Sequence, residues 1–195
     1  MNNLVEITAE KHGVIIDLRY ASNNNVCGHK MYSFPFCYLH LDAEKSLNKA
    51  VLLASNIGLK IKIWDSFRPL EVQKYMFDKF PSNDINGGFV SNPDGGAIPH
   101  CRGVAIDLTL CDFDGQELEM GTDFDEFSDL AFHNSNKISK AAQKNRLILA
   151  GIMSIAGFDF YKNEWWHYQL FNCRNYEIIK LENVKNYILD LKNDK

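Results

Sequence analysis

The sequence lacks a long hydrophobic segment. No apolar run approaches the roughly 18 residues that a membrane-spanning helix requires, and residues 1–6 lack the positively charged and apolar regions that open a secretion signal. We therefore expect a cytoplasmic protein with no membrane partner.

An excess of basic residues is also absent. The 21 Lys and Arg residues are outnumbered by 25 Asp and Glu residues, which gives a formal net charge of -4 at pH 7. A domain that binds nucleic acid usually carries a basic patch. The composition therefore argues against nucleic acid as a partner, and it contains no information on the oligomeric state.

Cysteine is scarce, and its five residues follow no recognisable spacing. They are Cys27, Cys37, Cys101, Cys111 and Cys173. An odd number without any Cys-x-x-Cys pair favours neither a disulfide framework nor a structural zinc site, and it indicates free thiols in a reducing compartment. Cys101 adjoins a histidine, but no pair that would activate a thiol nucleophile is evident, so we expect a structural role for it.

The sequence does contain enough apolar residues for one substantial core. They make up 46% of the 195 residues, and we find no internal repeat and no linker-like shift in composition, so we expect a single domain over residues 1–195. Hydrophobic periodicity predicts four helices, over about 43–57, 69–80, 138–156 and 181–192. Alternating or continuous apolar patterns predict strands over 14–20, 59–64, 104–110 and 166–170.

Three polar side chains in and near these elements are expected at helix ends or on the surface. Asp42 suits the N-cap of the first long helix. Arg146 lies on the polar side of the third helix, opposite its apolar stripe. His133 has no partner motif, and we expect it at the surface or in a helix cap.

The strongest chemical signal is a carboxylate inside an apolar strand. Alternation in residues 104–110 places Ile106 and Leu108 on one face and Asp107 on the other. A carboxylate at the centre of such a strand is costly to bury unless it meets a cation or hydrogen-bond donors. Asp107 is therefore a candidate metal ligand.

Two histidines can meet this carboxylate. In the next predicted strand His167 faces opposite to Trp166, so Asp107 and His167 converge if the two strands are neighbours, and His100 can fold over from the preceding loop. Two imidazoles and one carboxylate with an open fourth position form the ligand set of a catalytic zinc site. We expect one zinc ion per chain at His100, Asp107 and His167, which leaves Glu164 as a base for a water molecule.

An arginine lies at a junction that commonly presents functional side chains. Arg68 follows a predicted strand and directly precedes Pro69, which suits the start of a helix. A guanidinium is always protonated and presents several donors, so it can stabilise an oxyanion. The alternative is a surface ion pair with Asp65, which the residues alone leave open.

These motifs resemble those of the zinc D-alanyl-D-alanine dipeptidase family, the vancomycin-resistance type of D,D-dipeptidase within the wider zinc D,D-peptidase group. The family pattern Ser-x-His-x-x-Gly-x-Ala-x-Asp is met by His100, Gly103, Ala105 and Asp107, and the pattern Glu-x-Trp-His is met by Glu164, Trp166 and His167. One position departs, because Ile98 stands where the family has a Ser that helps to hold the substrate.

Three further segments resemble the same family and imply roles for their residues. The stretch from Asp17 to Ala21 matches an N-terminal signature whose Tyr lines the substrate pocket, here Tyr20. The Ser-Phe-Arg-Pro motif implies that Arg68 stabilises the charge on the scissile carbonyl oxygen. The Met-Gly-Thr-x-Phe-Asp segment implies that Asp125 lies near the free amino group of the substrate.

The resemblance implies a fold and an activity. The expected fold is α+β, with a central, mainly antiparallel sheet that carries the metal site and helices packed around it, as in hedgehog and D,D-peptidase domains. The expected activity is zinc-dependent hydrolysis of a short peptide that contains D-amino acids, most simply D-alanyl-D-alanine, by a metal-activated water with a Glu base. Two alternatives stay open: a D,D- or L,D-carboxypeptidase that acts on longer cell-wall peptides, and a non-catalytic metal-binding homologue.

Overall fold

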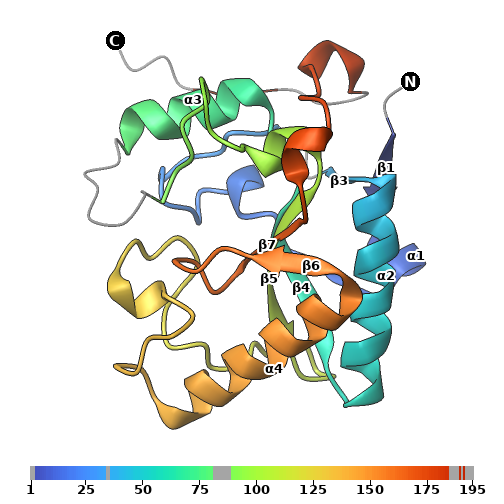
Figure 1. The fold of residues 1–195 in the computed structure, drawn as a ribbon, viewed down its shortest axis with the longest axis vertical. Coiled ribbons are helices and arrows are strands. Elements are labelled where there is room, and N and C mark those ends of the chain that lie inside the picture. The colour runs from blue at the N-terminus through green and yellow to red at the C-terminus, as the bar shows by residue number, and fades with distance from the viewer. Residues whose placement is uncertain (1–2, 34–35, 81–88, 185–188, 190, 192–195) are drawn as a thin grey trace.

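The computed structural model describes residues 3–33, 36–80, 89–184, 189 and 191, and within these ranges it has the expected α+β architecture (Figure 1). The centre is a five-stranded sheet in the order β2-β4-β5-β7-β6. These strands are Ile15–Ile16, Lys60–Asp65, Ala105–Cys111, His167–Leu170 and Phe158–Phe160 in that order. Only β2 and β4 are parallel, and the other neighbours are antiparallel.

A second, two-stranded sheet pairs β1 (Leu4–Ile7) with β3 (Cys37–His40) in antiparallel register. The helices are α1 (Ala9–His12), α2 (Leu41–Asn56), α3 (Leu70–Lys79) and α4 (Lys140–Ala156). Helices α2 and α4 pack against each other and against the central sheet, whereas α3 lies at the opposite end of the view from α4 (Figure 1). No helix in the described ranges has the length and hydropathy to cross a membrane.

Strand β5 is buried on both faces, and the hydrophobic core covers one of them. Ile106 and Leu108 pack with Leu47 of α2 and Leu149 of α4 in one hydrophobic cluster. Alternation turns Asp107 to the other face of the strand, and all seven residues of β5 are buried. The predicted strand is therefore confirmed, and its carboxylate lies in the interior rather than in solvent.

Two expectations about helix ends and faces are wrong. Helix α2 begins two residues early, at Leu41, because His40 and not Asp42 is the N-cap, and His40 Nδ1 accepts a hydrogen bond from the backbone N–H of Asp42 at 3.1 Å. Arg146 is only 2% exposed. Its guanidinium donates to the backbone carbonyls of Met120, Leu130 and Phe132, and these acceptors make its burial affordable.

His133 is half-buried, so its expected surface position is met only in part. Its ring packs against Phe160 and Tyr168, with centroid distances of 4.7 and 5.9 Å, and its backbone N–H donates to Lys162 O at 3.0 Å. Burial lowers the pKa of His133 to about 4. The ring therefore belongs to the packing that supports the segment before β7.

The expected strand 14–20 and the expected terminal helix differ from what is observed. The strand pattern ends after Ile16, and Tyr20 lies in a short 3₁₀-helix, Arg19–Ala21. Near the C-terminus, Leu181–Asn183 forms another 3₁₀-helix, and Leu189 makes an isolated antiparallel bridge with Tyr32. Much of the expected segment 181–192 lies outside the described residues, and those that are described do not form an α-helix.

Candidate metal centre and active site

Two adjacent strands bring Asp107 and His167 together. Strands β5 and β7 are antiparallel neighbours, and Asp107 and His167 are directly paired in their register. Both side chains are buried, with residue exposures of 3% and 7%. The structure therefore confirms that the two strands are neighbours and that both side chains lie on one face of the sheet.

His100 reaches the same point from the turn that precedes β5. It lies in a 3₁₀-helix, Pro99–Arg102, which ends at Gly103 with φ +68°. A Cβ at Gly103 would lie 2.8 Å from a Leu4 methyl carbon, so both the backbone conformation and the space require glycine there. This sharp turn lets the chain enter β5 with His100 folded back over Asp107.

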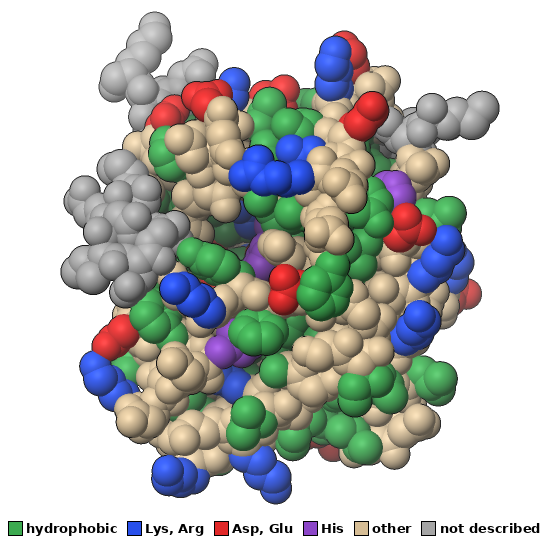
Figure 2. Space-filling view, in the orientation of Figure 1, with side chains coloured by type: hydrophobic (Ala, Val, Ile, Leu, Met, Phe, Trp, Pro, Cys, Tyr) green, Lys and Arg blue, Asp and Glu red, His purple; other side chains and the backbone are tan. Residues whose placement is uncertain are grey.

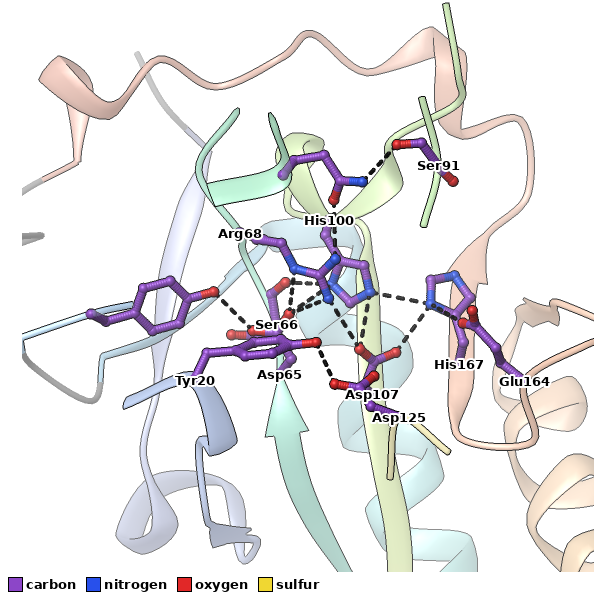
Figure 3. Close-up of polar contacts among 12 residues, drawn as sticks. Tyr20, Asp65, Ser66, Arg68, Ser91, His100, Asp107, Asp125, Glu164 and His167 are labelled. Atoms are coloured by element: carbon purple, nitrogen blue, oxygen red, sulfur yellow. Dashed lines mark hydrogen bonds and ion pairs between the residues drawn. The ribbon is translucent and has the colours of Figure 1, made fainter. Parts of the chain in front are cut away.

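The three side chains form a compact cluster with ligand atoms that face one another (Figure 3). His100 Nε2 lies 3.1 Å from His167 Nδ1 and 3.3 Å from Asp107 Oδ2, and His167 Nδ1 lies 3.0 Å from Asp107 Oδ1. Tetrahedral zinc with ligand bonds of about 2.0–2.2 Å separates its ligand atoms by roughly 3.3 Å. The spacing of the cluster therefore suits one small cation.

The hydrogen bonds behind the rings also fit a cation. His100 Nδ1 lies 2.6 Å from the Ser66 carbonyl oxygen, which only accepts, so the ring proton is on Nδ1 and the Nε2 lone pair faces the cluster. On the other ring, His167 Nε2 lies 3.1 Å from Gln169 Oε1. One nitrogen of each imidazole and the Asp107 carboxylate therefore face one another, an arrangement that a cation between them would stabilise.

Glu164 lies at the edge of this cluster. It is 7% exposed, it precedes β7 in the chain, and its Oε2 is 3.9 Å from His167 Nδ1. Burial, with a further contribution from the negative charges of Asp107 and Asp125, raises the pKa of Glu164 well above its ordinary value. A carboxylate with a raised pKa is a stronger base, which is the property that proton transfer near neutral pH needs.

Arg68 is buried beside the cluster. Its Nε and Nη2 donate to Asp65 Oδ2 at 2.9 and 2.8 Å, and its Nη2 also lies 3.5 Å from Asp107 Oδ2. Burial acts to lower the pKa of Arg68, but Asp65 and the other nearby acidic groups raise it, so the guanidinium stays charged. The pair with Asp65 that the sequence allowed is present, but it is in the interior and not on the surface.

Two residues that hold Arg68 were not predicted as part of the site. Asp65 is 1% exposed, and its only sequence signal is its place between an apolar strand and the Ser-Phe-Arg-Pro motif. Gln73 accepts from Arg68 Nη1 at 3.0 Å and donates to the Ser91 carbonyl at 2.8 Å. No pattern in the sequence identifies Gln73, because its role depends on how α3 packs.

Tyr20 and Asp125 form a second polar pair across the cavity. The Tyr20 hydroxyl donates to Asp125 Oδ2 at 2.7 Å, and the Arg68 guanidinium lies 5.1 Å from the centre of the Tyr20 ring. Burial raises the pKa of Asp125 to about 7, although the hydrogen bond from Tyr20 acts in the opposite direction. Burial also raises the pKa of Tyr20 well above its ordinary value, so its hydroxyl remains a donor.

All seven residues singled out from the sequence line one cavity of about 260 Å³, and Figure 2 shows a hollow near the centre of this face with a histidine side chain visible in it. The seven are Tyr20, Arg68, His100, Asp107, Asp125, Glu164 and His167. Ile98 also lines this cavity, with a left-handed backbone φ of 39° that is unusual for a β-branched residue. Ile98, the residue that departs from the family pattern, is therefore part of the cavity wall.

Comparison with known proteins identifies the family of the chain. The model of the family described as "D-ala-D-ala dipeptidase" (Peptidase_M15) matches residues 1–183. The chain is 35% identical over 180 residues to the D-alanyl-D-alanine dipeptidase of Escherichia coli strain K12, covering 90% of this chain and 89% of that protein. It is 32% identical over 179 residues to the D-alanyl-D-alanine dipeptidase of Enterococcus faecium, covering 82% and 87% respectively.

Proposed function

The chain belongs to the D-Ala-D-Ala dipeptidase family of metallopeptidases, and we propose that it hydrolyses D-alanyl-D-alanine with one zinc ion held by His100, Asp107 and His167. The observation that carries the proposal is the convergence of two imidazole lone pairs and a carboxylate in a cavity that also contains Glu164 and Arg68. The choice of zinc follows from the donor set, because two imidazoles suit zinc better than they suit magnesium or calcium. When bound, zinc lowers the pKa of a water molecule and polarises the scissile carbonyl.

Glu164 is the general base and then the general acid. Its carboxylate accepts a proton from the attacking water as the water oxygen bonds to the carbonyl carbon. It then delivers that proton to the amide nitrogen as the carbon–nitrogen bond breaks, which releases two D-alanine molecules without a covalent enzyme intermediate. Burial of Glu164, which raises its pKa, supports this assignment.

Arg68 stabilises the negative charge that develops on the carbonyl oxygen. Its guanidinium is fixed by Asp65 and Gln73, so it needs little rearrangement when the charge forms. Because Nη2 lies 3.5 Å from Asp107 Oδ2, the donor stands directly beside the metal-binding cluster. The ion pair of Arg68 with Asp65 is therefore compatible with a catalytic role, because Asp65 orients the Arg68 guanidinium.

Asp125 and Tyr20 bind the free ammonium group of the dipeptide. The half-buried Asp125 carboxylate compensates the ammonium for its lost hydration, and the Tyr20 hydroxyl holds one oxygen of that carboxylate in place. This arrangement favours a dipeptide over the longer cell-wall peptides of a carboxypeptidase. A peptide extended at its amino end would leave the Asp125 carboxylate buried without a cation.

Zinc analysis and product measurement test the proposal together. Protein purified with zinc should contain about one equivalent of metal and release D-alanine from D-alanyl-D-alanine. Glu164→Gln should keep the metal and lose roughly 10²–10⁴-fold in kcat, whereas His167→Ala should lose both metal and activity. A Glu164→Gln variant as active as wild type would reject the base, and wild-type protein that binds zinc without cleaving any D,D- or L,D-peptide would favour the non-catalytic homologue.

A further inference from the structure

We propose that Gln169 is a positioning residue for the metal centre, because it determines which nitrogen of His167 carries the proton and so keeps the other nitrogen available to a cation. The inference rests on the proposed function, since it assumes that His167 is a metal ligand. Gln169 is not one of the three residues that would bind the cation, and it acts only through His167.

The strand geometry places the two side chains together. His167 and Gln169 are two residues apart in β7, so both lie on the face of the sheet that carries Asp107. The residue paired with Gln169 on β5 is Ala105, whose small side chain leaves room for the amide. Gln169 also lines the same cavity as the ligand cluster.

The contact itself lies on the far edge of the His167 ring. One edge of the ring faces Asp107, and the other points away from the cluster (Figure 3). On that outer edge, His167 Nε2 is 3.1 Å from Gln169 Oε1. The Gln169 amide nitrogen lies 4.0 Å from Cys173 Sγ, a weak acceptor, which leaves the amide oxygen for the ring.

Accepting a proton from Nε2 has a consequence for the inner nitrogen. A neutral imidazole carries one proton, so a proton held at Nε2 by Gln169 leaves the Nδ1 lone pair free. Without an acceptor at Gln169 the proton can move to Nδ1, where it would donate to Asp107 Oδ1 at 3.0 Å and occupy the position that a cation needs. Gln169 therefore favours the tautomer that binds metal.

The two histidines differ in how firmly their surroundings fix the tautomer of the ring. His100 donates to the backbone carbonyl of Ser66, which can only accept a hydrogen bond and is present whatever the side chain at that position. His167 depends on a side-chain amide, which a single substitution can remove or exchange for a carboxylate. Outer hydrogen bonds of this kind typically change metal affinity 10–100-fold when they are lost.

Zinc affinity measured by chelator competition at one fixed pH tests the proposal. Gln169→Leu removes the acceptor and should weaken zinc binding 10–100-fold, whereas Gln169→Glu keeps an acceptor and should bind zinc at least as tightly as wild type. Gln116→Leu, at an exposed glutamine outside the cavity, is the matched control and should bind like wild type. ¹⁵N NMR of the metal-free proteins should show the His167 proton on Nε2 in wild type and on Nδ1 in Gln169→Leu.

The outcomes separate this inference from the proposed function. Wild-type protein that binds no zinc would overturn the proposed function and this inference with it. Wild type that binds one zinc while Gln169→Leu binds within twofold of it would overturn the inference alone. Weakening by Gln169→Glu equal to that by Gln169→Leu would also overturn it, because a general packing defect and not a lost acceptor would then be the cause.

Discussion

The Tyr20 hydroxyl donates a 2.7 Å hydrogen bond to the Asp125 carboxylate, although 105 residues separate the two in the chain. This bond joins a 3₁₀-helix near the N-terminus to a residue with a left-handed backbone φ of 59°. It fixes a carboxylate on the wall of the cavity that contains the metal-binding cluster, and it opposes the effect of burial on the pKa of Asp125.

Tyr20→Phe should shift the pH dependence of substrate capture. Asp125 must be ionised to bind an ammonium group, so kcat/KM should fall as the pH drops through the pKa of this carboxyl, about 7 in wild type. Without the hydroxyl the pKa rises further, so the fall in kcat/KM should begin at higher pH. Asp125→Asn is the control and should lose this acidic limb, and unchanged profiles in both variants would reject the assignment of Asp125.

Arg68→Lys should lower kcat with little effect on zinc content. Lysine keeps the positive charge beside Asp65 but loses the planar fork that contacts Asp65 and Gln73 at once. We expect a loss of roughly 10²–10³-fold in kcat, the magnitude typical of removing one oxyanion donor. Arg174→Lys, whose guanidinium contacts the Gly95 carbonyl outside the cavity, should leave kcat unchanged. Full activity in Arg68→Lys would show that a point charge is enough.

Ile98→Ser should lower the KM for D-alanyl-D-alanine. The family pattern has a Ser here that helps to hold the substrate, and Ile98 lines the cavity at this point. A hydrogen bond from the Ser hydroxyl to a charged group of the substrate is worth about 1.5–3 kcal/mol, so we expect KM to fall by roughly tenfold or more. Ile98→Ala removes the same apolar contact without adding a donor, and equal changes in KM for both variants would show that cavity size, not the hydroxyl, is responsible.

Arg146→Met should destabilise the fold. The backbone carbonyls of Met120 and Leu130 would lose the donor that Arg146 supplies, whereas Phe132 O would keep the Ser135 N–H. Each unsatisfied buried acceptor costs about 1–3 kcal/mol, so we expect a fall of about 2 kcal/mol or more in the free energy of unfolding. Denaturant unfolding measures it, with the exposed Lys144→Met as the control. Equal stability of the two variants would contradict a role for Arg146 in holding this segment.

Removal of metal should lower the thermal stability of the protein. Zinc at 100 times its Kd stabilises a protein that binds it only when folded by about 2.7 kcal/mol. A chelator should therefore lower the Tm of wild type and have no effect on His167→Ala, which lacks one ligand. A chelator effect of the same size in both proteins would place the stabilising metal elsewhere.

The pattern of the site could be predicted because its signals are local. Asp107 stands in a strand whose alternation fixes its face, and His167 stands two residues before Gln169 on a second such strand. These local periodicities, together with the family motifs, sufficed to name seven of the residues that line the cavity. Asp42 was wrong as an N-cap because His40, two residues earlier, takes that place, and Arg146 was wrong as a surface residue because its burial depends on carbonyl acceptors from distant segments.

The sequence by itself determined strands β4, β5 and β7, helices α2, α3 and α4 and the candidate chemistry, because hydrophobic periodicity and residue type act over short stretches of chain. Tertiary structure alone decided that β5 and β7 are neighbours in the register that pairs Asp107 with His167, and that Arg68 is buried with Asp65 and Gln73. It also decided which nitrogen of each histidine faces the cluster. For His100 that choice depends on a hydrogen bond to the Ser66 carbonyl, 34 residues away in the chain, which no local pattern records.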